Sequence, residues 1–167
     1  MAKGMGKRAL LAGAVVTALI LGTLAVASAG HENKLLFTEL DGRNEVANAA
    51  TNQKNVGDPN GSGEAYVFGI DGDVTTLCYI LTVDKIGTAT AAHIHEGAAG
   101  TNGPVVVNLA APADGNAADC LTEGETGKFV GDQTVLEILN NPSDYYVNVH
   151  SPEYPNGAIR GQLAPER

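Results

Sequence analysis

The chain has 167 residues, and its ten Lys or Arg against nineteen Asp or Glu give a net charge of −9. A surface this acidic repels nucleic-acid phosphates, and the sequence has no basic stripe with interleaved aromatics, so a nucleic-acid-binding function is excluded. The sequence also lacks a phosphate-binding loop, and we expect no nucleotide cofactor.

The first 29 residues have the pattern of a signal peptide. Three basic residues precede an uncharged apolar run at 9–26, and Ala27-Ser28-Ala29 has the small-x-small form of a cleavage site. We therefore expect a secreted or extracytoplasmic protein whose mature part, residues 30–167, is a single domain. The apolar run approaches the roughly 18 residues of a membrane helix. An uncleaved membrane anchor through residues 9–29 is therefore the alternative.

Cys78 and Cys120 are the only cysteines. In an oxidising compartment two cysteines are expected to pair, and their spacing lacks the CxxC form of a redox or zinc motif. Closing a loop of about 40 residues stabilises a fold by roughly 4 kcal/mol on the chain-entropy estimate. We therefore predict a structural disulfide.

The mature chain alternates short β-like runs with clusters of Gly, Asn, Asp and Pro. Strands are predicted at 35–40, 64–70, 74–83, 88–95, 103–110, 145–150 and 157–163, with a hairpin at Asp71-Gly72-Asp73 and a turn at Pro155-Asn156-Gly157. Residues 41–63 and 111–127 are predicted loops, and residues 128–130 form a short strand at best. This pattern predicts an all-β fold, an antiparallel sandwich or barrel.

Residues 132–142 are the one helical candidate. Asp132 can cap this helix, and Asn141-Pro142 stops it. Val135, Leu136 and Leu139 form its predicted apolar stripe. We therefore expect one short helix beside the strands.

Three of the four histidines fall in two predicted strands, His93 and His95 in AHIHEG and His150 in YYVNVHS. Side chains two apart on a strand share a face, so a neighbouring strand that carries His150 brings three imidazoles together. Three ring nitrogens with a fourth position open are a recurrent metal arrangement, and copper or zinc is the favoured ion. The sequence therefore predicts a mononuclear metal site.

Alternation along the strands decides where these histidines point. In YYVNVH the apolar set contains Val147 and Val149, while Asn148 and His150 share the opposite face. The site is therefore expected on the outer face of a sheet, under a loop. Arg160, in GAIRGQL, is expected beside it and partly exposed, where it would steer an anion or hold a carboxylate.

Two other roles for the histidines are open. They can be structural, with the imidazoles hydrogen-bonded to Asn148, Glu96 or Arg160, or the metal can serve an enzyme of unknown substrate. Glu96 points away from the histidines and Ala98 and Ala99 follow, so no nearby carboxylate completes a cupin-like site. We assign no catalytic residue, and an enzyme is the less favoured reading. His31 is expected in a tail, where it would chelate copper only as the N-terminal residue.

Three segments in the order of the chain, LDGRNEV at 40–46, AAHIHEGAAGTNGPVVVNL at 91–109 and YYVNVHSPEYPNGAIRGQL at 145–163, resemble the CHRD domain. This family is named after the secreted animal protein chordin, and the resemblance spans residues 35–164. It implies a secreted, immunoglobulin-like antiparallel β-sandwich, and it makes extracellular protein binding, as a binding or matrix module, an alternative function.

A more distant similarity is to copper–zinc superoxide dismutase. That enzyme is a Greek-key β-sandwich with an HxH strand, a later strand histidine and an anion-guiding arginine. Too few histidines remain here for its bridged copper and zinc ions, so dismutase activity is not expected.

Overall fold

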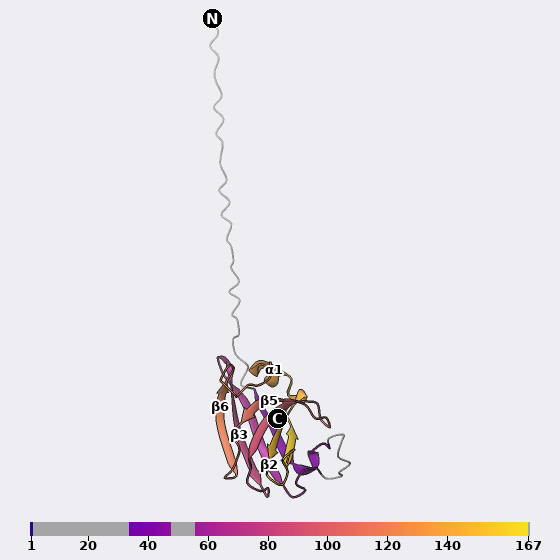
Figure 1. Cartoon of the computed structure of the whole chain (residues 1–167). Coiled ribbons are helices and arrows are strands. Elements are labelled where there is room, and N and C mark those ends of the chain that lie inside the picture. The colour runs from indigo at the N-terminus through magenta and orange to yellow at the C-terminus, as the bar shows by residue number, and fades with distance from the viewer. Residues whose placement is uncertain (2–33, 48–55, 167) are drawn as a thin grey trace.

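Antiparallel strands form nearly all of the regular structure in this computed structural model, which describes Met1, residues 34–47 and residues 56–166 (Figure 1). The predicted leader and His31 lie outside the described residues, as does part of the predicted loop at 41–63. The strands are β1 (Leu35–Asp41), β2 (Ser62–Ile70), β3 (Asp73–Asp84), β4 (Ala91–Glu96), β5 (Val105–Leu109), β6 (Asn116–Thr122), β7 (Tyr145–His150), β8 (Ile159–Gln162) and β9 (Ala164–Pro165).

The strands join into one sheet in the order β5-β4-β7-β8-β1-β2-β3-β6, with β9 added to β1. This sheet is nearly closed into a barrel, and the prediction of an antiparallel all-β fold with one short helix is confirmed. Its two four-stranded halves meet where Asp41 of β1 pairs with Arg160 of β8. That junction brings the segment after β1 beside β7 and β8.

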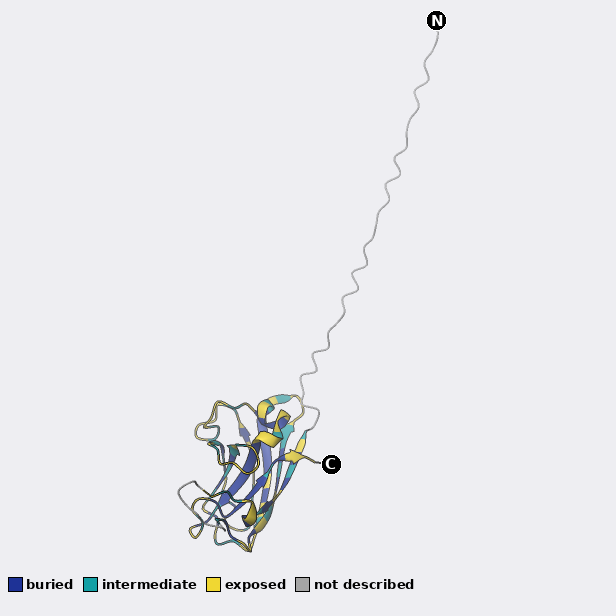
Figure 2. Ribbon diagram, turned by 90° about the vertical axis from the view of Figure 1, so that its right-hand side faces the viewer, coloured by how far each residue is buried: buried dark blue, intermediate teal, exposed yellow. Residues whose placement is uncertain are grey.

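Alternating apolar side chains fill the interior. Every other residue of β7, namely Tyr145, Val147 and Val149, is at most 3% exposed and belongs to the apolar core. Figure 2 shows buried residues along the strands, with exposed residues mainly in the connecting loops and on the outside of the helix. The predicted hairpin is present between β2 and β3, where Gly72 has a φ of +79°.

The prediction that residues 111–127 form a loop is wrong for β6. Asn116–Thr122 pairs with β3 along its whole length, from Thr82↔Asn116 to Thr76↔Thr122. Of its seven residues only Leu121 is buried, because β6 is the last strand on its side of the sheet. An edge strand with one buried side chain has no apolar alternation for sequence reasoning to detect.

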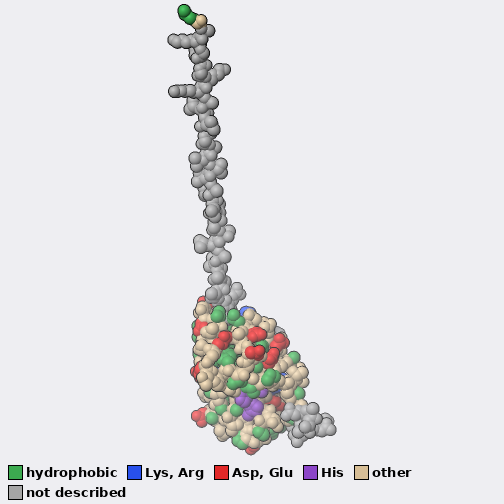
Figure 3. Space-filling view, turned by 45° about the horizontal axis from the view of Figure 1, so that its top comes forward, with side chains coloured by type: hydrophobic (Ala, Val, Ile, Leu, Met, Phe, Trp, Pro, Cys, Tyr) green, Lys and Arg blue, Asp and Glu red, His purple; other side chains and the backbone are tan. Residues whose placement is uncertain are grey.

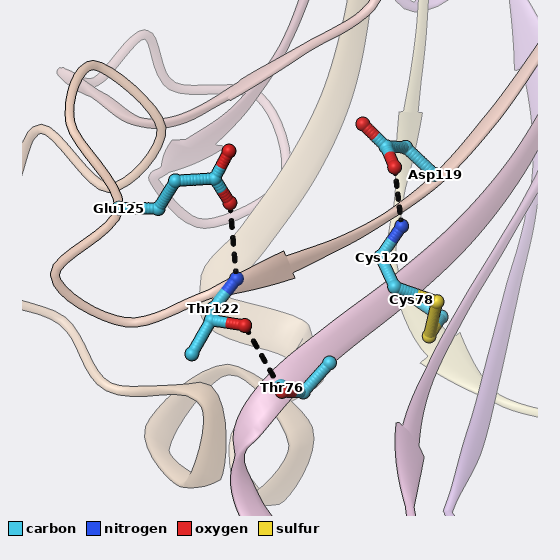
Figure 4. The surroundings of a disulfide bond; sticks show 6 residues. All are labelled: Thr76, Cys78, Asp119, Cys120, Thr122 and Glu125. Atoms are coloured by element: carbon cyan, nitrogen blue, oxygen red, sulfur yellow. Dashed lines mark hydrogen bonds between the residues drawn. A yellow bond between two sulfur atoms is a disulfide. The ribbon is translucent and has the colours of Figure 1, made fainter.

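The predicted disulfide joins β3 to β6. Cys78 and Cys120 face each other across the strand pair with their Cα atoms 4.0 Å apart, and their sulfurs are bonded. Figure 4 shows the hydrogen bonds around the disulfide: Thr76 bonds to Thr122, and the backbone N–H groups of Thr122 and Cys120 donate to the carboxylates of Glu125 and Asp119. The disulfide therefore holds the edge strand β6 against β3, although β6 buries little apolar surface.

The helix α1 (Val135–Asn140) is shorter than predicted, and its cap differs. Thr134, rather than Asp132, caps it: the Thr134 side chain accepts from the Glu137 N–H while the Glu137 carboxylate accepts from the Thr134 N–H. The predicted stop is confirmed, since the chain enters the 3₁₀ turn η2 (Pro142–Asp144) directly afterwards.

The buried stripe of α1 is Val135, Ile138 and Leu139, so Ile138 takes the place expected for Leu136. These three residues have the i, i+3, i+4 spacing of one helix face, and Leu136 lies beside that face, partly exposed. Among the described residues, no helix has the length and apolar character needed to cross a membrane.

Candidate metal centre

The three strand histidines meet on the outer face of the half-sheet β4-β7-β8. His93 and His95 lie on β4, and β7 runs alongside with His93 opposite Asn148 and His95 opposite Tyr146. His150 lies at the end of β7, diagonal to His93. Figure 3 shows the histidine side chains together at the surface. The structure therefore brings together the three residues that the sequence proposed as ligands.

The ring nitrogens lie close to one another. His93 Nδ1 is 3.1 Å from His150 Nε2, and one ring nitrogen from each of the three histidines lies within 4.8 Å of the others. Two ligands bound at 2.0–2.1 Å to one ion are about 2.9 Å apart at right angles and about 3.3 Å apart in a tetrahedron. The His93–His150 pair has this spacing, and a nitrogen–nitrogen gap as wide as 4.8 Å would have to close by roughly 1.5–1.9 Å through side-chain rotation.

Two of the imidazoles are oriented by backbone carbonyls. His95 Nδ1 donates to the carbonyl of Gly103 at 3.0 Å, and His150 Nδ1 donates to the carbonyl of Pro155 at 3.1 Å. In both rings this makes Nε2 the acceptor nitrogen: in His95 it faces the pocket, and in His150 it lies 3.1 Å from His93 Nδ1, which can donate to it in place of a metal ion. The structural reading of the histidines named other partners, Asn148, Glu96 and Arg160. The carboxylate of Glu96 instead accepts from Gln133.

His95 Nε2 is buried and has no hydrogen-bond partner among the residues that the structure describes. A buried polar atom left without a partner costs roughly 1–3 kcal/mol. Its ring is fixed from the other side by Gly103 and stacks on Tyr146, with centroids 4.8 Å apart and planes 9° apart. The Nε2 lone pair is thus held in the pocket, and no group of the described part of the chain hydrogen-bonds to it.

The pocket keeps its imidazoles neutral. Burial, together with the smaller effects of the neighbouring His150 and His95, lowers the pKa of His93 from 6.5 to about 4. Burial also lowers the pKa of His95 and of His150. All three rings are therefore uncharged at pH 7, which is the form that binds a metal ion.

Arg160 is 2% exposed, so the expectation of a partly exposed arginine is wrong. Its guanidinium donates to the carbonyl of Thr101 at 2.6 Å and to Asn102 Oδ1 at 3.1 Å, and it lies 3.4 Å from the ring centre of Tyr146. Both acceptors belong to the loop 97–104, which therefore covers Arg160. The Gly103 N–H of the same loop donates to Tyr146 Oη. Arg160 therefore anchors this loop, which also contacts His95 through the Gly103 carbonyl.

Sequence reasoning missed Glu45. It follows the 3₁₀ turn η1 (Gly42–Asn44), and both of its carboxylate oxygens accept from Asn148 Nδ2, at 2.9 and 3.1 Å. Burial raises the pKa of Glu45 to about 7, opposed by the Asn148 hydrogen bond and by the charge of Arg160. A carboxylate is therefore bonded to Asn148, the cross-strand partner of His93, although the strand sequence around the histidines contains no sign of it.

A search of protein families matches residues 36–163 to the family described as the CHRD domain. No curated protein and no solved structure matches the chain. The matched range runs from β1 through β8, and it contains the three histidines, Arg160 and Glu45. The residues that build the pocket thus all lie within the family domain.

Proposed function

We propose that this chain, which belongs to the CHRD domain family, binds one copper or zinc ion through His93, His95 and His150. The observation that carries the proposal is the buried, unpartnered Nε2 of His95, whose ring is held in place by the Gly103 carbonyl. A metal ion is the group that would use this lone pair together with the nitrogens of the other two rings.

The surroundings of the rings support this function. Ligating histidines usually donate their second ring N–H to a carbonyl or carboxylate, as His95 and His150 do here. Imidazole nitrogens suit copper and zinc, and three of them leave a further position on the ion. When bound, such an ion would supply Lewis acidity, or, as copper, one-electron chemistry.

An extracytoplasmic location belongs to the same proposal. The Cys78–Cys120 disulfide is typical of an oxidising compartment outside the cytoplasm. The basic, apolar and small-residue segments of the first 29 residues have the pattern of an export signal. Zinc or copper would then be acquired from outside the cytoplasm or during export.

The direct test is metal content and affinity. Protein purified from its native host should carry close to one equivalent of copper or zinc by elemental analysis, and metal-free protein should take up one equivalent in calorimetric titration. Alanine at His93 should abolish this uptake. His31, outside the described residues, is the matched control, and His31→Ala should bind as the wild type does. Substoichiometric metal in both experiments would contradict the proposal.

A second function, extracellular protein binding, is favoured by a row of half-buried and exposed apolar side chains on the other half of the sheet. Phe37, Tyr66 and Ile80 lie side by side on β1, β2 and β3. The two rings are 4.9 Å apart, and Ile80 is 45% exposed. A partner recovered from the extracellular fluid should be lost with Ile80→Lys and retained with His93→Ala. The opposite pattern would tie binding to the histidines instead.

A further inference from the structure

Glu45 is a half-buried carboxylate that the three-histidine pocket does not use as a ligand. We infer that Glu45 supplies the negative charge that balances a divalent ion in this pocket. The inference rests on the proposed function, because Glu45 would act on the ion that the three histidines bind.

The first link between Glu45 and the ligands is Asn148. Its amide nitrogen donates to both carboxylate oxygens of Glu45. On the same sheet face Asn148 is paired with His93 and stands two residues before His150. Paired residues have Cβ atoms about 5 Å apart, so a single side-chain amide separates the carboxylate from the imidazoles.

The second link is the turn at 155–157. The carbonyl of Pro155 accepts from His150 Nδ1 and so orients that ring. Two residues later Gly157 has a φ of +135°, and a Cβ at this position would stand 2.5 Å from both carboxylate oxygens of Glu45. The turn that fixes a ligand therefore also borders the carboxylate, and its glycine leaves the space that Glu45 occupies.

The charges around Glu45 favour such a role. The positive charge that acts on Glu45 is that of Arg160 on β8. On its other side Gly57 packs against the Glu45 side chain, and the neighbouring Asp58 is the charged residue of that segment. The histidines of β4 and β7 are neutral at pH 7 and add no charge. A divalent ion among them would bring two positive charges into a partly buried site, and an ionised carboxylate nearby offsets that cost.

The same carboxylate should release a proton when the ion binds. Burial raises the pKa of Glu45 to about 7, so at neutral pH it is close to half protonated. A doubly positive neighbour favours the ionised form of a carboxyl group. Because the histidines are already neutral at this pH, the protons released would come from Glu45 and from any water bound to the ion.

The test is calorimetric titration of the metal-free protein with Zn²⁺ in buffers of different ionisation enthalpy, which counts the protons released. At pH 7 the wild type should release about half a proton more than Glu45→Gln, and at pH 8.5 this difference should vanish, as expected for a group with a pKa near 7. Zinc-bound water contributes to both proteins and cancels in the comparison. The affinity of Glu45→Gln for Zn²⁺ should fall about tenfold or more.

Glu39→Gln is the matched control, because Glu39 is an exposed carboxylate on β1, and it should titrate like the wild type. Glu45→Asp keeps the charge and should keep most of the affinity and proton release. It also serves as the test variant if Glu45→Gln does not fold, and loss of the extra proton in a folded Glu45→Asp protein would contradict the inference. Equal proton counts and affinities in wild type and Glu45→Gln would overturn it. Failure of the wild type to bind Zn²⁺ or Cu²⁺ would instead overturn the proposed function.

Discussion

Arg160→Ala should cost the protein roughly 4 kcal/mol of unfolding free energy. The substitution removes two charge-assisted hydrogen bonds, to Thr101 and Asn102, and a guanidinium stacked 3.4 Å from Tyr146. Hydrogen bonds to charged groups contribute about 1.5–3 kcal/mol each and a desolvated cation–π contact about 2 kcal/mol, less the cost of burying the charge. In a domain of this size such a loss lowers the melting temperature by roughly 10–20 °C.

Urea unfolding of the metal-free protein measures this loss, and Arg160→Lys separates the two roles considered for the arginine. Lysine keeps the charge needed to steer an anion but cannot form the planar fork that holds the loop 97–104, so it should lose most of the same stability. Arg43→Ala is the control, because Arg43 forms an exposed ion pair with Asp41 and should cost about 0–1 kcal/mol.

Zn²⁺ affinity of the Arg160 variants provides a second measurement. The loop carries the Gly103 carbonyl that orients His95, so releasing the loop should weaken binding about 10–100-fold, as loss of such supporting contacts does. A stability of Arg160→Ala within 1 kcal/mol of the wild type would refute this reasoning. Wild-type behaviour of Arg160→Lys in both assays would refute it equally.

Three further predictions concern the disulfide, the acid range and one glycine. Replacing Cys78 and Cys120 together by alanine should cost about 4 kcal/mol in urea unfolding, because the bond closes a 42-residue loop; a loss below 1 kcal/mol would contradict this. Since the pKa of His93 is 6.5 in the unfolded chain and about 4 in the fold, the unfolded state binds more protons between these pH values. The metal-free protein should therefore lose about 1–2 kcal/mol as the pH falls from 6.5 to 4, which is less than the full linkage value because solvent screens the partly exposed His93 ring. His93→Gln should lack this component; identical pH profiles would speak against it. Gly157→Ala should cost about 1–3 kcal/mol by thermal melting, because alanine is strained at a φ of +135° and its Cβ would collide with Glu45. A melting temperature unchanged by the substitution would rule out that collision.

The period-two pattern of the strands was enough to place the histidines. Val147 and Val149 must face the core, so Asn148 and His150 face the other way whatever the tertiary arrangement. The same reasoning applies to Ile94 between His93 and His95. Because alternation follows from the geometry of a single strand, the face of each histidine could be predicted without knowing which strands are neighbours.

Elements without an apolar pattern could not be predicted in this way. β6 is defined by backbone hydrogen bonds to β3 and by the disulfide, while its own sequence buries only Leu121. The start of α1 depended on whether Thr134 or Asp132 caps the helix, and both are acceptable capping residues. Whether residues 116–122 form a strand or a loop, and which residue caps α1, therefore depend on contacts with the rest of the fold.

The sequence by itself determined the strands that have an apolar pattern, the shared face of His93 and His95, and the cysteine pair, because these follow from local periodicity and composition. Only the tertiary structure decided that Arg160 is buried and that Glu45 stands beside the pocket. Glu45 is 48 residues from His93 along the chain. The pairing of Asp41 on β1 with Arg160 on β8 places η1 over the outer face of β7, where Glu45 bonds to Asn148. Such a contact depends on strand order and register, which alternation within a strand does not encode.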